Sequence, residues 1–227
     1  MAEIKSVMTC KTLSDAFNAI KDCWEWTETK DMKNSSGDIL AKLLYVNADT
    51  YIELDKKGSA TFVTLNLYFK GQNVLSLGSS NNDNCTNLYV IKTNTATIIQ
   101  YDSNNKLTPI ETTAIILSTA TNHYTGIKEK VASYFKSPSM TTNSYNRSCI
   151  CSKEINNSAL TDSSVFAGIS ANSAVSSLCP FFSKQSQVTL DDVFLFTSYQ
   201  PSELYRGDCT INGRRYYVCN LIAVLDE

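Results

Sequence analysis

The residue types that could support covalent chemistry are few and scattered along this chain. His123 is the only histidine, so any Ser-His-Asp or Cys-His arrangement would have to use it. It stands in a stretch of turn formers between Ala120 and Gly126, and no Gly-x-Ser-x-Gly segment surrounds any serine. We therefore predict a surface histidine in a turn and no catalytic residue.

Paired carboxylates are a second chemical possibility, because glycosidases use two acids whose pKa values are separated. Asp191, Asp192, Glu203 and Asp208 are available. The adjacent pair Asp191 and Asp192 would point to opposite sides of an extended chain, so we interpret it as the polar lead-in to a strand at Val193. A small hydrolase that uses this pair or the histidine stays as a weaker alternative.

Metal and cofactor sites have no sequence support. The chain has eight cysteines, but the closest pair is Cys149 and Cys151, and there is no Cys-x-x-Cys. The eight glycines are not clustered into a loop that could hold phosphate. We predict no metal and no cofactor, and we expect most of the cysteines to be buried, reduced thiols.

Aromatic residues offer a better candidate for function. Trp24 and Trp26 flank the end of the predicted helix and are candidates for stacking on sugars. Tyr216 and Tyr217 follow two arginines, a composition typical of protein interfaces, and because they are adjacent in a strand we expect one to be buried and one exposed. The candidate interface consists of Arg214, Arg215, Tyr216, Tyr217, Tyr199 and Tyr205.

Length and composition describe a folded, nearly neutral protein. The 227 residues are 43% hydrophobic, which is enough for a substantial core. The 20 basic and 22 acidic residues show no basic excess, which argues against a nucleic-acid binder. The apolar runs, such as 114–117 and 221–225, have the length of buried strands and are too short to cross a membrane.

The elements that must position these residues are mostly strands. Residues 12–24 form the one firm helix, capped by Thr12 or Ser14 and amphipathic through Phe17, Ile20 and Trp24. The period-two patterns predict about nine strands, with hairpins over 51–69, 88–101 and 210–218. Because no βαβ alternation occurs, we predict a mainly β fold, α+β only at the margins, with β-sandwich or barrel-like sheets and an N-terminal amphipathic helix.

Two features bear on domain organisation. The turn formers of residues 102–106 are the best candidate linker, which predicts domains at 1–105 and 106–227 unless the chain forms one continuous domain. Residues 136–187 are rich in Ser, Thr and Asn and are expected to be largely loop, with a role in surface or oligomer contacts.

The order of segments in the second half is also informative. It begins with a strand, turn and strand at 112–135, continues with the polar stretch 149–155 and a Ser-rich tract, and closes with a hairpin from Gly207 through Asn212 and Gly213 to the acidic Glu227. This order resembles a type of virion structural protein from tailed bacteriophages and prophages of gut bacteria. The resemblance covers about half the chain and implies a virion component present in many copies.

Together these observations predict a non-enzymatic virion structural protein of a head, neck, tail or baseplate that acts through subunit assembly. Its expected partners are copies of itself and other virion proteins, without nucleic acid or membrane. A glycan- or receptor-binding surface module, with a host glycan as ligand, stays open as the alternative. The first 17 residues have no signal-peptide pattern, so we expect synthesis in the bacterial host cytoplasm and a final location in the virion.

Overall fold

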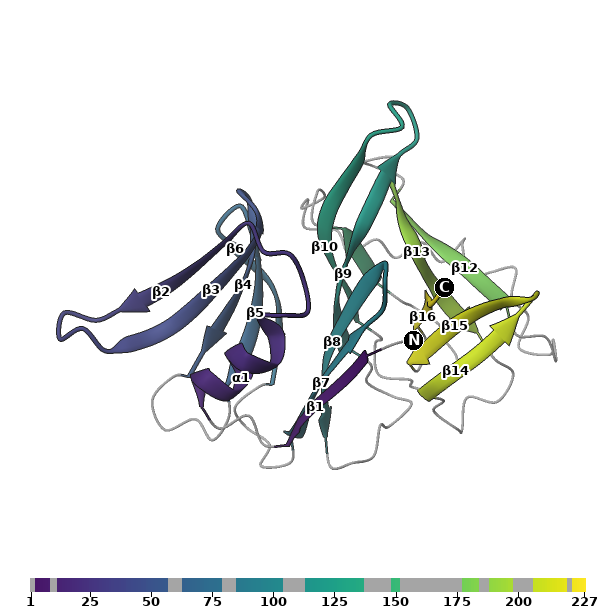
Figure 1. Ribbon diagram of the computed structural model, residues 1–227. Coiled ribbons are helices and arrows are strands. Elements are labelled where there is room, and N and C mark those ends of the chain that lie inside the picture. Colours follow the sequence, from purple (N-terminus) through teal and green to yellow (C-terminus); the bar gives the residue numbers. More distant parts are fainter. Residues whose placement is uncertain are drawn as a thin grey trace.

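The protein is built almost wholly from antiparallel strands. The computed structural model describes residues 3–8, 12–56, 63–78, 85–103, 113–136, 148–151, 177–183, 188–197, 206–219 and 222–227. Within these ranges the chain forms sixteen strands and one helix, arranged as two sheets (Figure 1). The predicted mainly β fold with a small N-terminal helix is therefore confirmed.

The smaller sheet is a five-stranded meander in which each strand pairs with the next along the chain. Its order is β2-β3-β4-β5-β6, and every pair is antiparallel. The strands are β2 (Glu28–Lys33), β3 (Ile39–Asn47), β4 (Thr50–Asp55), β5 (Thr64–Phe69) and β6 (Gln72–Leu77).

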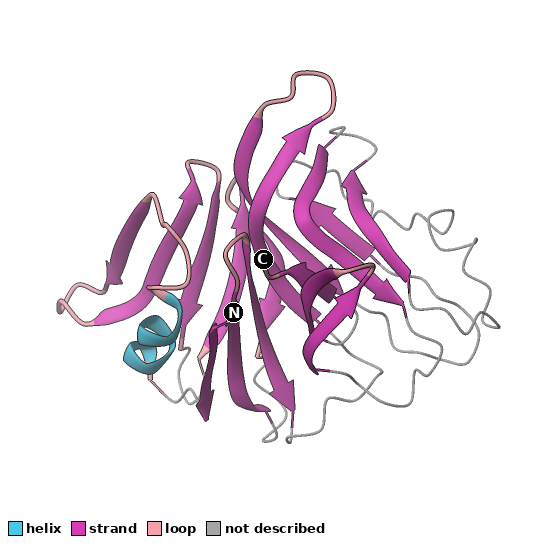
Figure 2. Ribbon diagram, turned by 45° about the vertical axis from the view of Figure 1, so that its right-hand side comes forward, coloured by secondary structure: helices cyan, strands magenta, loops and turns pink. Residues whose placement is uncertain are grey.

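The larger sheet has eleven strands and curls strongly (Figure 2). Its main path runs β1-β7-β8-β9-β13-β16-β15-β14, while β10 and β11 continue from β9, and β12 lies beside β13. The strands are β1 (Glu3–Met8), β7 (Cys85–Lys92), β8 (Ala96–Ser103), β9 (Thr113–Asn122), β10 (Lys128–Lys136), β11 (Ser148–Cys151), β12 (Ser177–Ser183), β13 (Val188–Thr197), β14 (Arg206–Ile211), β15 (Arg214–Cys219) and β16 (Ile222–Leu225).

The helix α1 (Leu13–Ile20) begins as predicted but ends earlier. The Thr12 hydroxyl accepts a hydrogen bond from the Asp15 N–H at 3.1 Å and donates one to the Asp15 carboxylate at 2.7 Å. Ala16, Ala19 and Ile20 are buried, so α1 packs its apolar face into the core. Trp24 lies beyond the end of the helix.

Two large apolar clusters account for the core. One lies between the smaller sheet, α1 and the strands β7 to β9, and it contains Ile52, Leu54, Ile99 and Ile115. The other lies on the opposite face of β7 to β9, against β13, β15 and β16. Because β8 and β9 are covered on both faces, adjacent residues such as Ile98 and Ile99, or Ile115 and Ile116, are both buried.

The structure differs from the sequence predictions in the polar segments. β1 and β2 were not predicted, because their alternation of apolar and polar residues is weak. The stretch 136–187 was expected to be largely loop, yet it contains β11 and β12, which are stabilised by pairing with β10 and β13. The rest of that stretch lies outside the described residues.

The larger sheet is continuous across the predicted linker. β8 belongs to the first half and β9 to the second, and they pair directly, with Ile98 opposite Ile116. The linker 102–106 thus joins two adjacent strands of one sheet, and Asp102 and Ser103 still belong to β8. The division of the chain at residue 105 remains a prediction.

Candidate functional site: the tip of the β9–β10 hairpin

The β9–β10 hairpin extends beyond the rest of the larger sheet, at the top of Figure 1. The two strands stay paired from Thr113 and Lys136 up to Thr121 and Lys128. The strand, turn and strand that the resemblance implies over residues 112–135 correspond to this hairpin. The spacing of Ile127 and Val131 in the sequence left a helix open as an alternative for 127–135, and the structure forms the strand β10 there. Its tip, residues 122–127, is presented away from both sheets (Figures 1 and 2).

Asn122 organises the tip. Its side-chain carbonyl accepts hydrogen bonds from the backbone N–H groups of Tyr124 and Thr125, each at 3.0 Å. Its backbone N–H donates to Ile127 O at 3.0 Å, and its backbone carbonyl accepts from Gly126 N at 2.8 Å. Gly126 has φ +67°, a conformation that glycine adopts without strain. The loop is thus held in one conformation by its own hydrogen bonds.

The tip presents exposed apolar side chains in the part of the chain that the structure describes. The side chain of Tyr124 is 81% exposed and that of Ile127 is 56% exposed. An aromatic side chain on an ordered loop loses little conformational entropy when a partner buries it, which makes it an efficient anchor for binding. The arrangement is therefore suited to insertion into a pocket on a partner.

Polar contacts at the base of the tip attach the hairpin to β13. His123 Nε2 lies 2.5 Å from Thr189 Oγ1, and the Thr121 hydroxyl donates to Asp191 Oδ1 at 2.6 Å. Lys128 Nζ lies 3.3 Å from the other carboxylate oxygen of Asp191. His123 is exposed in a turn, as predicted. These residues brace the hairpin from the neighbouring strand.

The carboxylate pair Asp191 and Asp192 does not precede a strand, as the sequence analysis expected, but lies inside β13. Asp192 has φ +59°, so the strand is irregular at this position. Pairing of Val188 and Thr189 with β9 extends the strand toward its N-terminal side, which the local sequence did not indicate.

Arg214 and Arg215 of the predicted interface form ion pairs within the chain, and the interface itself stays a prediction. Arg214 forms two hydrogen bonds with the Glu227 carboxylate, at 2.9 and 3.1 Å. Arg215 Nη2 donates to Asp226 Oδ2 at 2.7 Å. The pKa values of both guanidiniums are raised, chiefly by these hydrogen bonds.

Tyr216 and Tyr217 are both buried, so the expectation that one of them is exposed was wrong. Tyr217 belongs to the apolar cluster inside the curled sheet. Tyr216 lies on the opposite face, where its ring meets that of Phe194 edge to face at a centroid distance of 5.8 Å. A strand covered on both faces buries adjacent residues alike. Tyr199 and Tyr205 lie outside the described residues.

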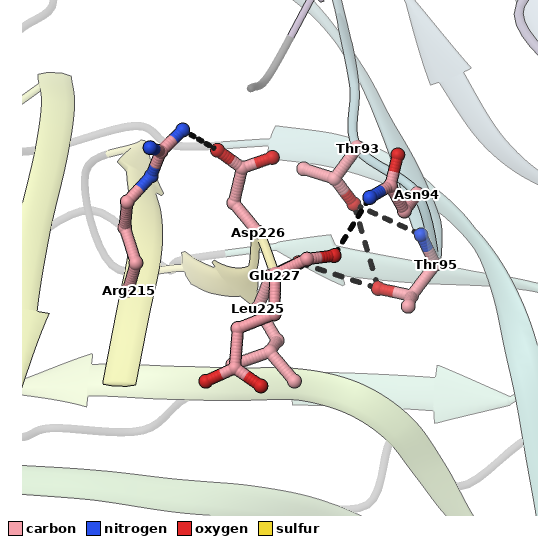
Figure 3. A network of polar contacts seen from close by, with 7 residues as sticks. All are labelled: Thr93, Asn94, Thr95, Arg215, Leu225, Asp226 and Glu227. Carbon is pink, nitrogen blue, oxygen red and sulfur yellow. Dashed lines mark hydrogen bonds and ion pairs between the residues drawn. The ribbon is translucent and has the colours of Figure 1, made fainter. Parts of the chain in front are cut away.

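Arg215 and the β7–β8 turn hold the last residues of the chain from two sides (Figure 3). Asn94 Nδ2 donates to the main-chain oxygen of Glu227 at 2.6 Å, and Thr95 Oγ1 donates to Leu225 O at 3.3 Å. The last residues thus contact the first half of the chain through Asn94 and Thr95 and the second half through Arg214 and Arg215.

The aromatic and thiol candidates take internal positions. Trp24 and Trp26 are half-buried against the core between the two sheets, and Trp26 Nε1 donates to Lys21 O at 3.0 Å. Cys23 is buried and is not part of a disulfide, as expected, and Cys209 is half-buried and likewise not part of a disulfide.

A row of tyrosines on the outer face of the smaller sheet was missed. Tyr45, Tyr51 and Tyr68 lie directly opposite one another on β3, β4 and β5. The rings of Tyr51 and Tyr68 are stacked at 4.9 Å, which is the distance between neighbouring strands. The planes of the Tyr51 and Tyr68 rings therefore stand upright on the sheet, and one face of each ring packs against the other ring. Aligning the hairpins in the sequence would have revealed this row.

Burial raises the pKa of Tyr51, and the neighbouring Tyr68, Glu53 and Tyr45 raise it further. On the same face, Asn66 donates to Glu53 Oε2 at 3.1 Å and accepts from the Ser76 hydroxyl at 2.7 Å. Because the Tyr51 ring lies between the rings of Tyr45 and Tyr68, this ring is poorly suited to stacking on a sugar.

A shallow hollow of about 470 Å³ lies between α1 and β2–β3, lined by Phe17, Thr29, Lys30, Asp31, Lys33 and Lys42. Lys42 Nζ is 2.8 Å from Asp31 Oδ1 and 4.6 Å from the centre of the Phe17 ring. The charge of Lys42 is thus satisfied inside the hollow.

No three His, Cys, Asp or Glu side chains come together as metal ligands in the part of the chain that the structure describes. Within the same ranges no helix combines the length and the apolar character needed to cross a membrane.

No protein-family model, curated protein or solved structure matches this chain.

Proposed function

We propose that this chain is a structural protein of a larger assembly and that the β9–β10 tip is one of its contact sites. The observation that carries the proposal is the 81% exposed side chain of Tyr124 on a loop held by its own hydrogen bonds. A pre-ordered aromatic anchor beside a second exposed apolar residue has the character of a binding hot spot.

The proposed assembly is a virion of the tailed-phage type. The segment 112–135, which contributes to the resemblance to virion proteins, corresponds to this hairpin. In this proposal the protein is made in the bacterial host cytoplasm and takes up its position in the particle by surface complementarity. Other virion proteins and further copies of this chain are the proposed partners.

A glycan- or receptor-binding module is the second candidate. The same residue favours it, because an exposed tyrosine ring provides an apolar face with a hydroxyl at its edge. A glycan array separates the two functions, since an assembly component should show no preference among sugars. Selective binding that disappears in Tyr124→Ala would support the second candidate.

The first experiment asks whether the chain belongs to a particle. Particles released by induced lysis of the source culture are purified on a density gradient and probed with an antibody against this chain. Co-sedimentation in fixed stoichiometry supports the proposal. Recovery only in the soluble fraction contradicts it.

The second experiment tests the tip. Tyr124→Ala and Ile127→Ala should each lower incorporation into particles about tenfold, which corresponds to roughly 1.4 kcal/mol of binding free energy. The matched control is Leu40→Ala, which removes a 53% exposed apolar side chain from β3. Unchanged thermal unfolding of each variant shows that the fold is intact. Normal incorporation of both tip variants would overturn the assignment of the contact site.

A further inference from the structure

The strand β2 forms an open edge of the smaller sheet. Among the described residues its only strand partner is β3. All six of its residues are exposed, whereas β3 to β5 are largely buried. In Figure 1 β2 lies at the outer side of this sheet. Its unpaired backbone groups are therefore accessible to another strand.

The charges of β2 follow a specific order. Glu28 and Lys30 point to one face of the sheet, together with Met32, because they lie opposite Tyr45, Leu43 and Ala41 of β3.

Neither Glu28 nor Lys30 forms an ion pair with any described residue. Asp31, on the other face, is already paired with Lys42 at 2.8 Å. On the face that Glu28 and Lys30 share, the charges without an ion pair are thus an acid and a base that are two residues apart.

Identical antiparallel strands can pair around a two-fold axis perpendicular to the sheet. Residues equally far from the axis then lie opposite each other on the same face. With the axis at Lys30, two lysines oppose each other, and with the axis at Asp31, two aspartates do. Like charges in this position destabilise the pair.

An axis at Thr29 gives a different result. Glu28 then lies opposite Lys30 of the partner subunit, and Lys30 lies opposite the partner's Glu28. The two threonines meet at the axis, which is a favourable cross-strand pair. An axis at Met32 would place Lys33 opposite Asp31 of the partner subunit, and it would therefore depend on the Asp31 that Lys42 already neutralises.

We propose that two copies of this chain join through their β2 strands, in antiparallel register centred on Thr29, so that the two small sheets become one continuous sheet. The inference rests on the proposed assembly function and names a second copy as the partner of this edge. Edge charges ordinarily prevent strand pairing. Here they disfavour the registers centred on Lys30 and Asp31 and favour the one centred on Thr29.

The contact is short, so we expect weak association that salt weakens further. Sedimentation equilibrium of the full chain over a range of concentrations at low salt measures it. Lys30→Glu and Glu28→Lys should each weaken self-association about tenfold, because each places like charges opposite each other twice.

Recombining the charges provides the decisive comparison. The double variant E28K/K30E should associate like the original chain, and a mixture of the two single variants should form heterodimers. Lys33→Glu is the control, since it makes the same charge change as Lys30→Glu on the same strand. In the Thr29-centred register Lys33 lies outside the overlap of residues 28–30, opposite the partner's Glu25, which Lys130 already pairs, so the effect should be smaller than that of Lys30→Glu. In a register centred on Met32 the same change would abolish pairing.

The proposal is overturned if the chain shows no concentration-dependent association, or if neither the double variant nor the mixture restores it. Such a result leaves the assembly function to be decided by the effect of Tyr124→Ala on particle incorporation. Conversely, charge-dependent dimers together with normal incorporation of the Tyr124 variant support the β2 contact and contradict the tip contact.

Discussion

The side-chain carboxylate of Asp226 is fully buried and lies 2.7 Å from the guanidinium of Arg215, which is 41% exposed. The backbone N–H of Asp226 also donates to the carbonyl of Arg215, at 3.0 Å. The pair therefore fixes the chain after β16 against the start of β15, next to the β7–β8 turn (Figure 3). The Arg215 side chain remains in contact with water, whereas the buried Asp226 carboxylate depends on Arg215 for neutralisation of its charge.

Arg215→Ala should destabilise the protein more than Arg214→Ala. The first change leaves a buried carboxylate without its cation, which is costly. The second leaves Glu227, whose side chain is 48% exposed and can be solvated. Thermal unfolding at pH 7 followed by circular dichroism measures the difference. Equal unfolding temperatures for the two variants would show that burial of the carboxylate does not matter.

Stability should depend on the ionisation of Glu227. The hydrogen bond from Arg214 lowers the pKa of this carboxyl below its ordinary value of 4.5. A lowered folded-state pKa stabilises the fold above the ordinary value, and the contribution disappears as the pH falls through the folded-state pKa. Glu227→Gln should therefore unfold at a lower temperature than the original chain at pH 7 and at the same temperature near pH 3.

High salt should reduce the difference at pH 7, because both side chains of the pair are exposed. The pKa of Glu25 is lowered in the same way as that of Glu227, in this case by the hydrogen bond from Lys130. A difference between Glu227→Gln and the original chain that persists at pH 3 would contradict the assignment.

A substitution at Lys70 in the β5–β6 turn should stabilise the protein. Lys70 and Gly71 have φ values of +46° and +77°, close to the +51° and +78° of Asn212 and Gly213 in the β14–β15 turn. Asparagine tolerates this region better than lysine does. Lys70→Asn should therefore raise the free energy of unfolding by about 0.5 kcal/mol, and Gly213→Ala should lower it by about 1 kcal/mol. Urea unfolding checks both values, and a destabilised Lys70→Asn would refute the argument.

The core between the two sheets should respond strongly to truncation. Leu54 is completely buried, so Leu54→Ala should cost about 2 to 5 kcal/mol through lost burial and the cavity that remains. Leu40→Ala removes the same atoms from a side chain that is 53% exposed and should change stability by about 0.5 kcal/mol or less. Similar costs at both positions, measured by urea unfolding, would contradict the assignment of the core.

Local sequence signals were sufficient for several elements. Thr12 and Asp15 indicate the start of the helix in the sequence, because the N-cap hydrogen bond joins two residues that are only three positions apart. Asn212 and Gly213 mark a hairpin because a two-residue turn needs positive φ values. The alternation in β4 and β5 predicts strands because one face of the smaller sheet packs on the core. Each of these signals depends on neighbours along the chain.

Long-range contacts decided the roles of the remaining residues. Arg215 and Asp226 are neutralised by each other, and Tyr216 and Tyr217 are both buried, because the larger sheet curls and covers both faces of β15. The tyrosine row and the open edge of β2 arise from the order of strands in the smaller sheet. The composition and periodicity of this chain thus determine that it is a β protein, whereas the pairing of distant strands determines which side chains reach its surface.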